Sequence, residues 1–186
     1  MKEKKSGWLF PEIDKVEKKQ KAEKKGEKSL FNDTLAKIQA TKDKQLRSKI
    51  IQDAAKSRMP WVVEILIRCL DDPSEEIRDL IVEDLGNRNN FDLNLLYRRL
   101  LSPPWYAKTG CLKILGLRKV PSSVKHIRAL MTDPNIEVRR TVAIVLGEIG
   151  TENALALLSE LTKDRSSFVR ASAQQTLQKA SELKSS

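Results

Sequence analysis

Histidine is almost absent from this chain, since His126 is the only one among 186 residues. A metal site built from several imidazoles is therefore excluded within one chain, and no metal ligand is predicted. Cysteine is nearly as scarce. Cys69 and Cys111 do not form a Cys-x-x-Cys motif, and both fall within apolar helical patterns. We interpret them as small buried side chains rather than reactive thiols.

Other signatures of catalysis and membrane association are also missing. The chain has no phosphate-binding glycine loop, so neither a cofactor nor an enzymatic activity is expected. It has no run of 18 apolar residues, so no membrane insertion is expected. Its start, MKEKKSGWLFPEIDK, lacks the apolar stretch of a secretory signal. Together with the two cysteines, these features favour a cytoplasmic location.

What the chain does contain is a repeat. The segment Asp133–Gly147 reads DPNIEVRRTVAIVLG, and related segments begin at residues 41, 72, 102 and 164. The spacing of 30 or 31 residues is typical of stacked helical repeats. Within the segments, Asp or Ser at the start predicts a helix N-cap, and the proline that follows in three of them suits the first helical position. Gly86, Gly116 and Gly147 are predicted to close their helices in the left-handed conformation.

Apolar residues at helical spacing pair each of these helices with a preceding one. No segment shows sustained period-two alternation, so no sheet is expected. The fold class predicted is all-α, a solenoid of about five helix pairs covering residues 30–181. The repeats are placed at 30–57, 58–87, 90–117, 121–150 and 151–181, with a frayed end at 182–186. Residues 1–29 are rich in Lys and Glu and are expected to form a disordered tail, or at most a frayed helix over residues 13–25.

The motif Asp-Pro-x-x-x-Val-Arg leading to Leu-Gly resembles HEAT repeats, most closely the short type of phycobilisome lyase subunits. The resemblance implies a right-handed α/α superhelix whose second helices line a concave face. It is specific for fold and not for function. The repeated acids and arginines are expected to form a structural ladder between repeats. Its members are Asp72, Arg78, Asp133, Arg139, Asp164 and Arg170.

A concave surface can be outlined by comparing the same position in each repeat. Two positions are polar or variable while their neighbours stay apolar, which indicates exposure. An extended surface of this kind serves protein binding in such folds. Phe168 could instead pack within a degenerate last repeat. The predicted partner-binding residues are Glu76, Glu83, Tyr106, Lys113, Glu137, Arg140 and Phe168.

The formal charge of +10 is concentrated in residues 93–132, which hold eight basic residues and no acid. With the aromatic residues Tyr97, Trp105 and Tyr106 interleaved, this region suits either nucleic acid or an acidic protein. The side chains could form one patch or point in several directions. The basic candidates are Arg98, Arg99, Lys108, Lys113, Arg118, Lys119, Lys125 and Arg128.

The Lys/Glu-rich start contains one apolar island, Trp8-Leu9-Phe10. It could be a linear motif for a partner or could fold back onto the array. The function predicted overall is a non-catalytic, monomeric scaffold that holds a protein partner on its concave face. Nucleic-acid binding is the alternative, and a chromophore-lyase-like role is a remote one suggested by the repeat type.

Overall fold

The computed structural model describes residues 11–57 and 59–185, and side chains within residues 25–57 and 59–182. These residues form helices joined by short turns, and no strand occurs among them. The all-α solenoid expected from the sequence is confirmed. The helices are α1 Pro11–Ala40, α2 Lys44–Ala55, α3 Pro60–Cys69, α4 Glu75–Asn87, α5 Asn94–Leu100, α6 Trp105–Leu117, η1 Pro121–Ser123, α7 Val124–Ile127, η2 Arg128–Thr132, α8 Ile136–Ile149, α9 Glu152–Leu161 and α10 Ser167–Ser185.

The chain divides into two compact units, one up to Ala54 and one from Ala55 onward. The first unit contains α1 and most of α2. Asp43 caps α2, because its Oδ1 accepts a 2.7 Å hydrogen bond from the amide of Leu46. Arg47 of α2 donates to the carbonyls of Thr41 and Lys42, which ties the helix to the turn before it.

Helix α1 differs from the sequence expectation for residues 11–29, since one helix runs from Pro11 to Ala40. Lys and Glu both have high helix propensity, and opposite charges stand four residues apart at Asp14 and Lys18 and at Glu17 and Lys21. The role of residues 1–29 as a separate tail stays a prediction. Trp8, Leu9 and Phe10 lie outside the described residues.

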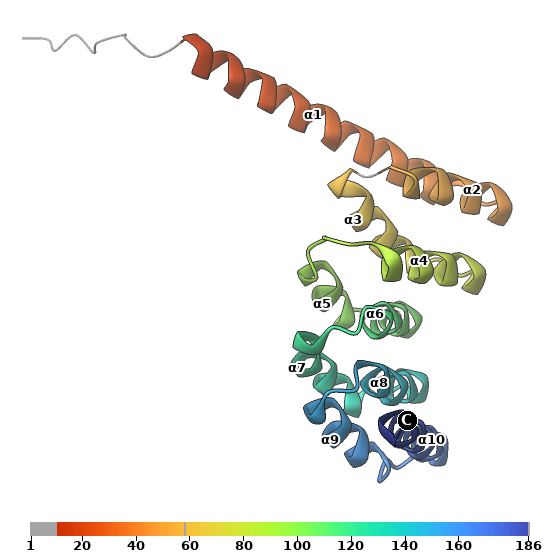
Figure 1. Ribbon diagram of the computed structural model, residues 1–186. Coiled ribbons are helices and arrows are strands. Elements are labelled where there is room, and N and C mark those ends of the chain that lie inside the picture. Colours follow the sequence, from red (N-terminus) through yellow and green to blue (C-terminus); the bar gives the residue numbers. More distant parts are fainter. Residues whose placement is uncertain (1–10, 58, 186) are drawn as a thin grey trace, which may run out of the picture. The chain divides into compact units, whose positions relative to one another are not determined.

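The second unit is a stack of helix pairs in two layers (Figure 1). Helices α3, α5, α7 and α9 form one layer, while α4, α6, α8 and α10 lie side by side in the other. We call these the first-helix and second-helix layers. The core between them is aliphatic, with Leu66, Ile81, Leu112, Val142 and Leu158 fully buried. Each repeat therefore buries its apolar face against its neighbours.

The second helices begin two residues later than expected from the sequence. In α8 the N-cap is Asn135, whose Oδ1 accepts from the amides of Glu137 and Val138 at 2.8 and 3.3 Å. Asp133 instead accepts from the amide of Asn135 at 2.9 Å, forming the turn that leads into the cap. Asp72 and Asp164 bond in the same way to the amides of Ser74 and Ser166. In each of these repeats the aspartate forms a turn and the N-cap follows two residues later. The residue directly after the aspartate, a proline in two of the three, therefore lies outside the helix.

The glycine prediction is also corrected. Gly86, Gly116 and Gly147 lie inside α4, α6 and α8, and the left-handed glycine is Gly150, the C-cap of α8 at φ 67°. The three helical glycines are sites of close approach between successive second helices. A Cβ on Gly86 would lie 2.8 Å from Leu117 Cδ1 of α6, and one on Gly147 would collide with Thr176 Cγ2 of α10. Glycine is needed there for packing rather than for backbone conformation.

Candidate protein-binding surface

Helices α4, α8 and α10 each have an arginine at the same position, and the three arginines make the same local contacts. Nη1 of Arg139 donates to the carbonyls of Asp133 and Pro134, at 2.8 and 3.4 Å. Nη1 of Arg78 donates to those of Asp72 and Pro73, and Nη1 of Arg170 to those of Asp164 and Arg165. Each arginine therefore holds the turn that precedes its own helix.

At this position, Arg139 and Lys108 also reach the acid of the following repeat. Nε and Nη2 of Arg139 bind the two carboxylate oxygens of Asp164 at 2.8 and 3.0 Å. Lys108, which stands in place of the arginine in α6, binds Asp133 at 2.7 Å. The Arg139–Asp164 pair is nearly inaccessible, with side-chain exposures of 2% and 6%. Because Arg139 donates to its carboxylate, the pKa of Asp164 lies below its usual value.

The connection between α4 and α6 is different, because Ser102 stands where three other repeats have aspartate. The guanidinium of Arg78 lies over the ring of Tyr106, 4.6 Å from its centroid. Tyr106 is half-buried and also packs edge-to-face against Trp105, with ring centroids 5.7 Å apart. One inter-repeat ion pair is thus replaced by a cation–π contact.

Four of the eight basic candidates bind residues that lie far from them in the sequence. Arg99 pairs with Asp71, Lys108 with Asp133, and Lys113 with Asp79 at 3.3 Å. Arg118 donates to the carbonyl of Arg88 and stacks over Phe91. The exposed remainder is divided among several elements rather than placed on one helix face: Arg98 is on α5, Lys119 follows α6, Lys125 is on α7 and Arg128 is on η2.

The candidate partner-binding residues lie on the second helices. Glu76, Glu83, Lys113, Glu137 and Arg140 are exposed, and Arg140 pairs with Glu137 at 3.0 Å. Phe168 is 72% exposed, so it lies outside the core of the last repeat.

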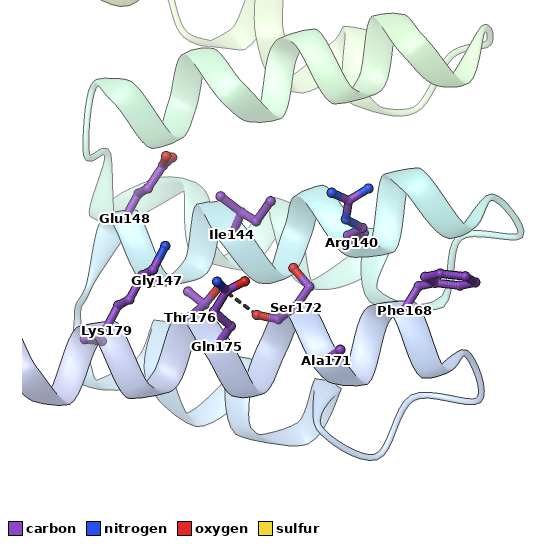
Figure 2. A pocket seen from close by; sticks show the side chains of 11 residues that line it. Arg140, Ile144, Gly147, Glu148, Phe168, Ala171, Ser172, Gln175, Thr176 and Lys179 are labelled. Atoms are coloured by element: carbon purple, nitrogen blue, oxygen red, sulfur yellow. Dashed lines mark hydrogen bonds between the residues drawn. The ribbon is translucent and has the colours of Figure 1, made fainter.

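A groove of about 660 Å³ runs between α8 and α10 (Figure 2). Ile144, 38% exposed, and Phe168, 72% exposed, are the two large apolar side chains that line it. Gly147 and Thr176 lie at a close approach of the two helices. Arg140, Glu148 and Lys179 also line the groove. Burial raises the pKa of Glu148, although the nearby Lys119 opposes this. The groove therefore combines an apolar centre with charged groups.

Comparison of the same position in the five repeats predicted that Phe168 is exposed, because this position is polar or variable in the other copies. It did not identify Gly147, Thr176 and Lys179 as part of a groove. Thr176 and Lys179 come to line a groove with Ile144 and Gly147 only when α10 packs on α8. The sequence offered one signal for Lys179: it follows Phe168 by eleven residues, about three helical turns, which places both on the same face of a helix.

The Cys111 thiol is buried and the His126 ring is stacked on another aromatic ring. Burial raises the pKa of the Cys111 thiol to about 12, so this thiol is protonated near neutral pH. His126 stacks on Tyr97 with ring centroids 3.9 Å apart. Within the described part of the chain, no group of three or more His, Cys, Asp or Glu side chains could hold a metal ion. None of the helices described is long and apolar enough to cross a membrane.

Comparison with known families agrees with the geometry of the stack. Residues 93–178 match the family of HEAT repeats. This part of the chain is similar to HEAT repeats. The matched HEAT repeats extend from α5 into α10 and include the groove between α8 and α10. The match does not single out the phycobilisome lyase type, which stays a prediction.

Among solved structures, a similar one is the crystal structure of an engineered protein from the Northeast Structural Genomics Consortium. The two chains share 16% sequence identity with a TM-score of 0.46, over 80% of this chain and 78% of that chain. No curated protein matches the sequence.

Proposed function

We propose that this HEAT-repeat protein is a non-catalytic scaffold that binds a protein partner on its second-helix layer, with the groove between α8 and α10 as the main contact. The layer corresponds to the concave side that HEAT-like stacks use for binding. The observation that carries the proposal is the exposure of Phe168 and Ile144 in this groove. Both side chains line the same groove, with Ile144 near its middle and Phe168 at one end (Figure 2). Exposed apolar side chains gathered on a hollowed surface mark interaction sites, whereas scattered single ones are common on any protein.

Aromatic residues at such positions contribute disproportionately to binding. Burying a side chain as large as phenylalanine removes a large apolar area from water at a small cost in side-chain entropy. Arg140 and Lys179 are cations at the same groove, and could orient a partner through its acidic or carbonyl groups. The proposal includes a cytoplasmic location and a monomeric scaffold.

The proposal predicts that Phe168→Ser and Ile144→Ser each weaken capture of the partner by about tenfold or more, as expected for central contacts. The measurement is quantitative affinity purification of the full chain from native lysate, with and without nuclease. Leu101→Ser is the matched control, because Leu101 is also 72% exposed but follows α5 in the first-helix layer.

Equal capture by the wild type, Phe168→Ser and Leu101→Ser would contradict the proposal. Release of the captured material by nuclease would also contradict it and would favour the nucleic-acid alternative. That alternative is weakened by the pairing of Arg99, Lys108 and Lys113 with aspartates of other repeats.

A further inference from the structure

We propose that Arg78 is a binding site for a carboxylate, namely an acidic side chain of the partner protein. This inference rests on the proposed function and adds the chemistry of one contact. It follows from comparing Arg78 with Arg139, which occupies the same position two repeats later.

The guanidinium of Arg139 forms two sets of hydrogen bonds. Nη1 binds the carbonyls of its own turn, while Nε and Nη2 form a fork that binds Asp164. In Arg78, Nη1 binds the carbonyls of its own turn in the same way, at 2.7 and 3.0 Å. Its backbone contacts therefore hold the guanidinium in the arrangement that presents the fork in Arg139.

Among the described residues, Arg78 donates only to backbone carbonyls and pairs with no acid, and Ser102 occupies the position of the next repeat's aspartate. Instead, the guanidinium is supported from one side by the ring of Tyr106. A planar cation stacked on a ring can still donate from its edges, since the contact uses its face. Arg78 is thus held by its own turn through Nη1 and by the Tyr106 ring on one face, which leaves Nε and Nη2 as the donors for a ligand.

The space beside Arg78 is open. A hollow of about 150 Å³ between α4, α6 and α8 is lined by Arg78, Tyr106, Lys113 and Trp105, and Trp105 is 44% exposed. This volume holds a carboxyl-bearing side chain, given that one water takes up about 30 Å³. Trp105 adds an apolar surface for the stem of such a side chain.

Three acids also line this hollow and oppose an incoming carboxylate. Asp79 is paired with Lys113 and Glu137 with Arg140. Glu75, in the first turn of α4, is exposed and forms no ion pair with any residue that the structure describes. Removing its charge with Glu75→Gln should therefore tighten carboxylate binding at Arg78.

The test is an NMR titration of the full chain, following the Nε–Hε resonances of the arginines. The probe is a short peptide amide with one central Glu, and the same peptide with Gln is its control. We expect a saturable shift of the Arg78 resonance with the Glu peptide and none with the Gln peptide. Arg139 provides an internal control, because its fork is occupied by Asp164.

Ser102→Asp supplies the missing acid within the chain and should abolish the response of Arg78 to the peptide. No shift of Arg78 in the wild type, or the same shift in Ser102→Asp, would overturn the inference. Neither result would bear on the groove at Phe168, so failure here is distinguishable from failure of the proposed function. Inorganic phosphate serves as a second probe, and a response to phosphate but not to the Glu peptide would also overturn the inference.

Discussion

Replacing Asp164 with Asn is expected to destabilise the protein by about 3 kcal/mol, because it leaves the charge of Arg139 buried without its counterion. Arg139 is 2% exposed, and its Nε and Nη2 both depend on this carboxylate. Asn keeps an oxygen that can accept from the amide of Ser166, so the turn before α10 is preserved. The measurement is the free energy of unfolding from denaturant titration.

The matched control for this substitution is Asp79→Asn. Asp79 also pairs with a cation from another repeat, Lys113, but the two side chains are 55% and 47% exposed. Exposed pairs contribute up to about 1 kcal/mol, since water and salt screen them. Losses of similar size in the two variants would contradict the distinction between the buried and the exposed pair.

The same pair makes stability depend on pH. Because the pKa of Asp164 is lowered in the folded protein, its contribution is fully present above the pKa of the unfolded chain, about 4. It is lost as the pH falls through the lower, folded pKa. The stability difference between the wild type and Asp164→Asn should therefore be constant from about pH 5 to 7 and shrink below pH 4.

Gly147→Ala is the second substitution with a large expected effect. In an exposed helix it would stabilise by up to about 1 kcal/mol through helix propensity. Here the new Cβ would collide with Thr176 Cγ2 of α10. Thr176 cannot rotate away without losing the 2.8 Å hydrogen bond from its hydroxyl to the carbonyl of Ser172. Overpacking of this kind costs about 1 to 3 kcal/mol, so we expect a net loss of stability.

Two further variants separate packing from propensity. Thr176→Ser removes the colliding methyl group and keeps the hydroxyl, so Gly147→Ala should be tolerated or stabilising in that background. Gly26→Ala is the control in α1, because nothing lies within 4 Å of a Cβ there. If Gly147→Ala were as favourable as Gly26→Ala in the wild-type background, the close approach of α8 and α10 would not constrain this position.

The repeat and its helices could be predicted from the sequence because apolar spacing is a local property that recurs every 30 or 31 residues. The caps show the limit of local reasoning. Asp133 and Asn135 are both good capping residues, and the sequence does not rank them. Gly147 and Gly150 are both candidates for a helix end, and the choice depends on where α10 approaches α8.

Which charged side chains remain available on the surface could not be predicted from the local sequence. Eight basic residues between positions 93 and 132 suggested a positive patch, but the structure brings Asp71, Asp79 and Asp133 to three of them. Those acids are 20 or more residues away in sequence, so pairing between repeats determines which charges remain available. The position of Phe168 could be predicted, whereas the groove beside it depends on the packing of two helices.

The measurement that tests the proposed function most directly is site-specific photocrosslinking from position 168. A photoreactive phenylalanine analogue placed there is nearly isosteric with the native side chain and reports what touches the groove in native lysate. The account predicts one protein crosslinked from position 168 and none from position 101, the equally exposed site in the first-helix layer. The same crosslinks from both positions, or nucleic acid crosslinked at position 168, would contradict it.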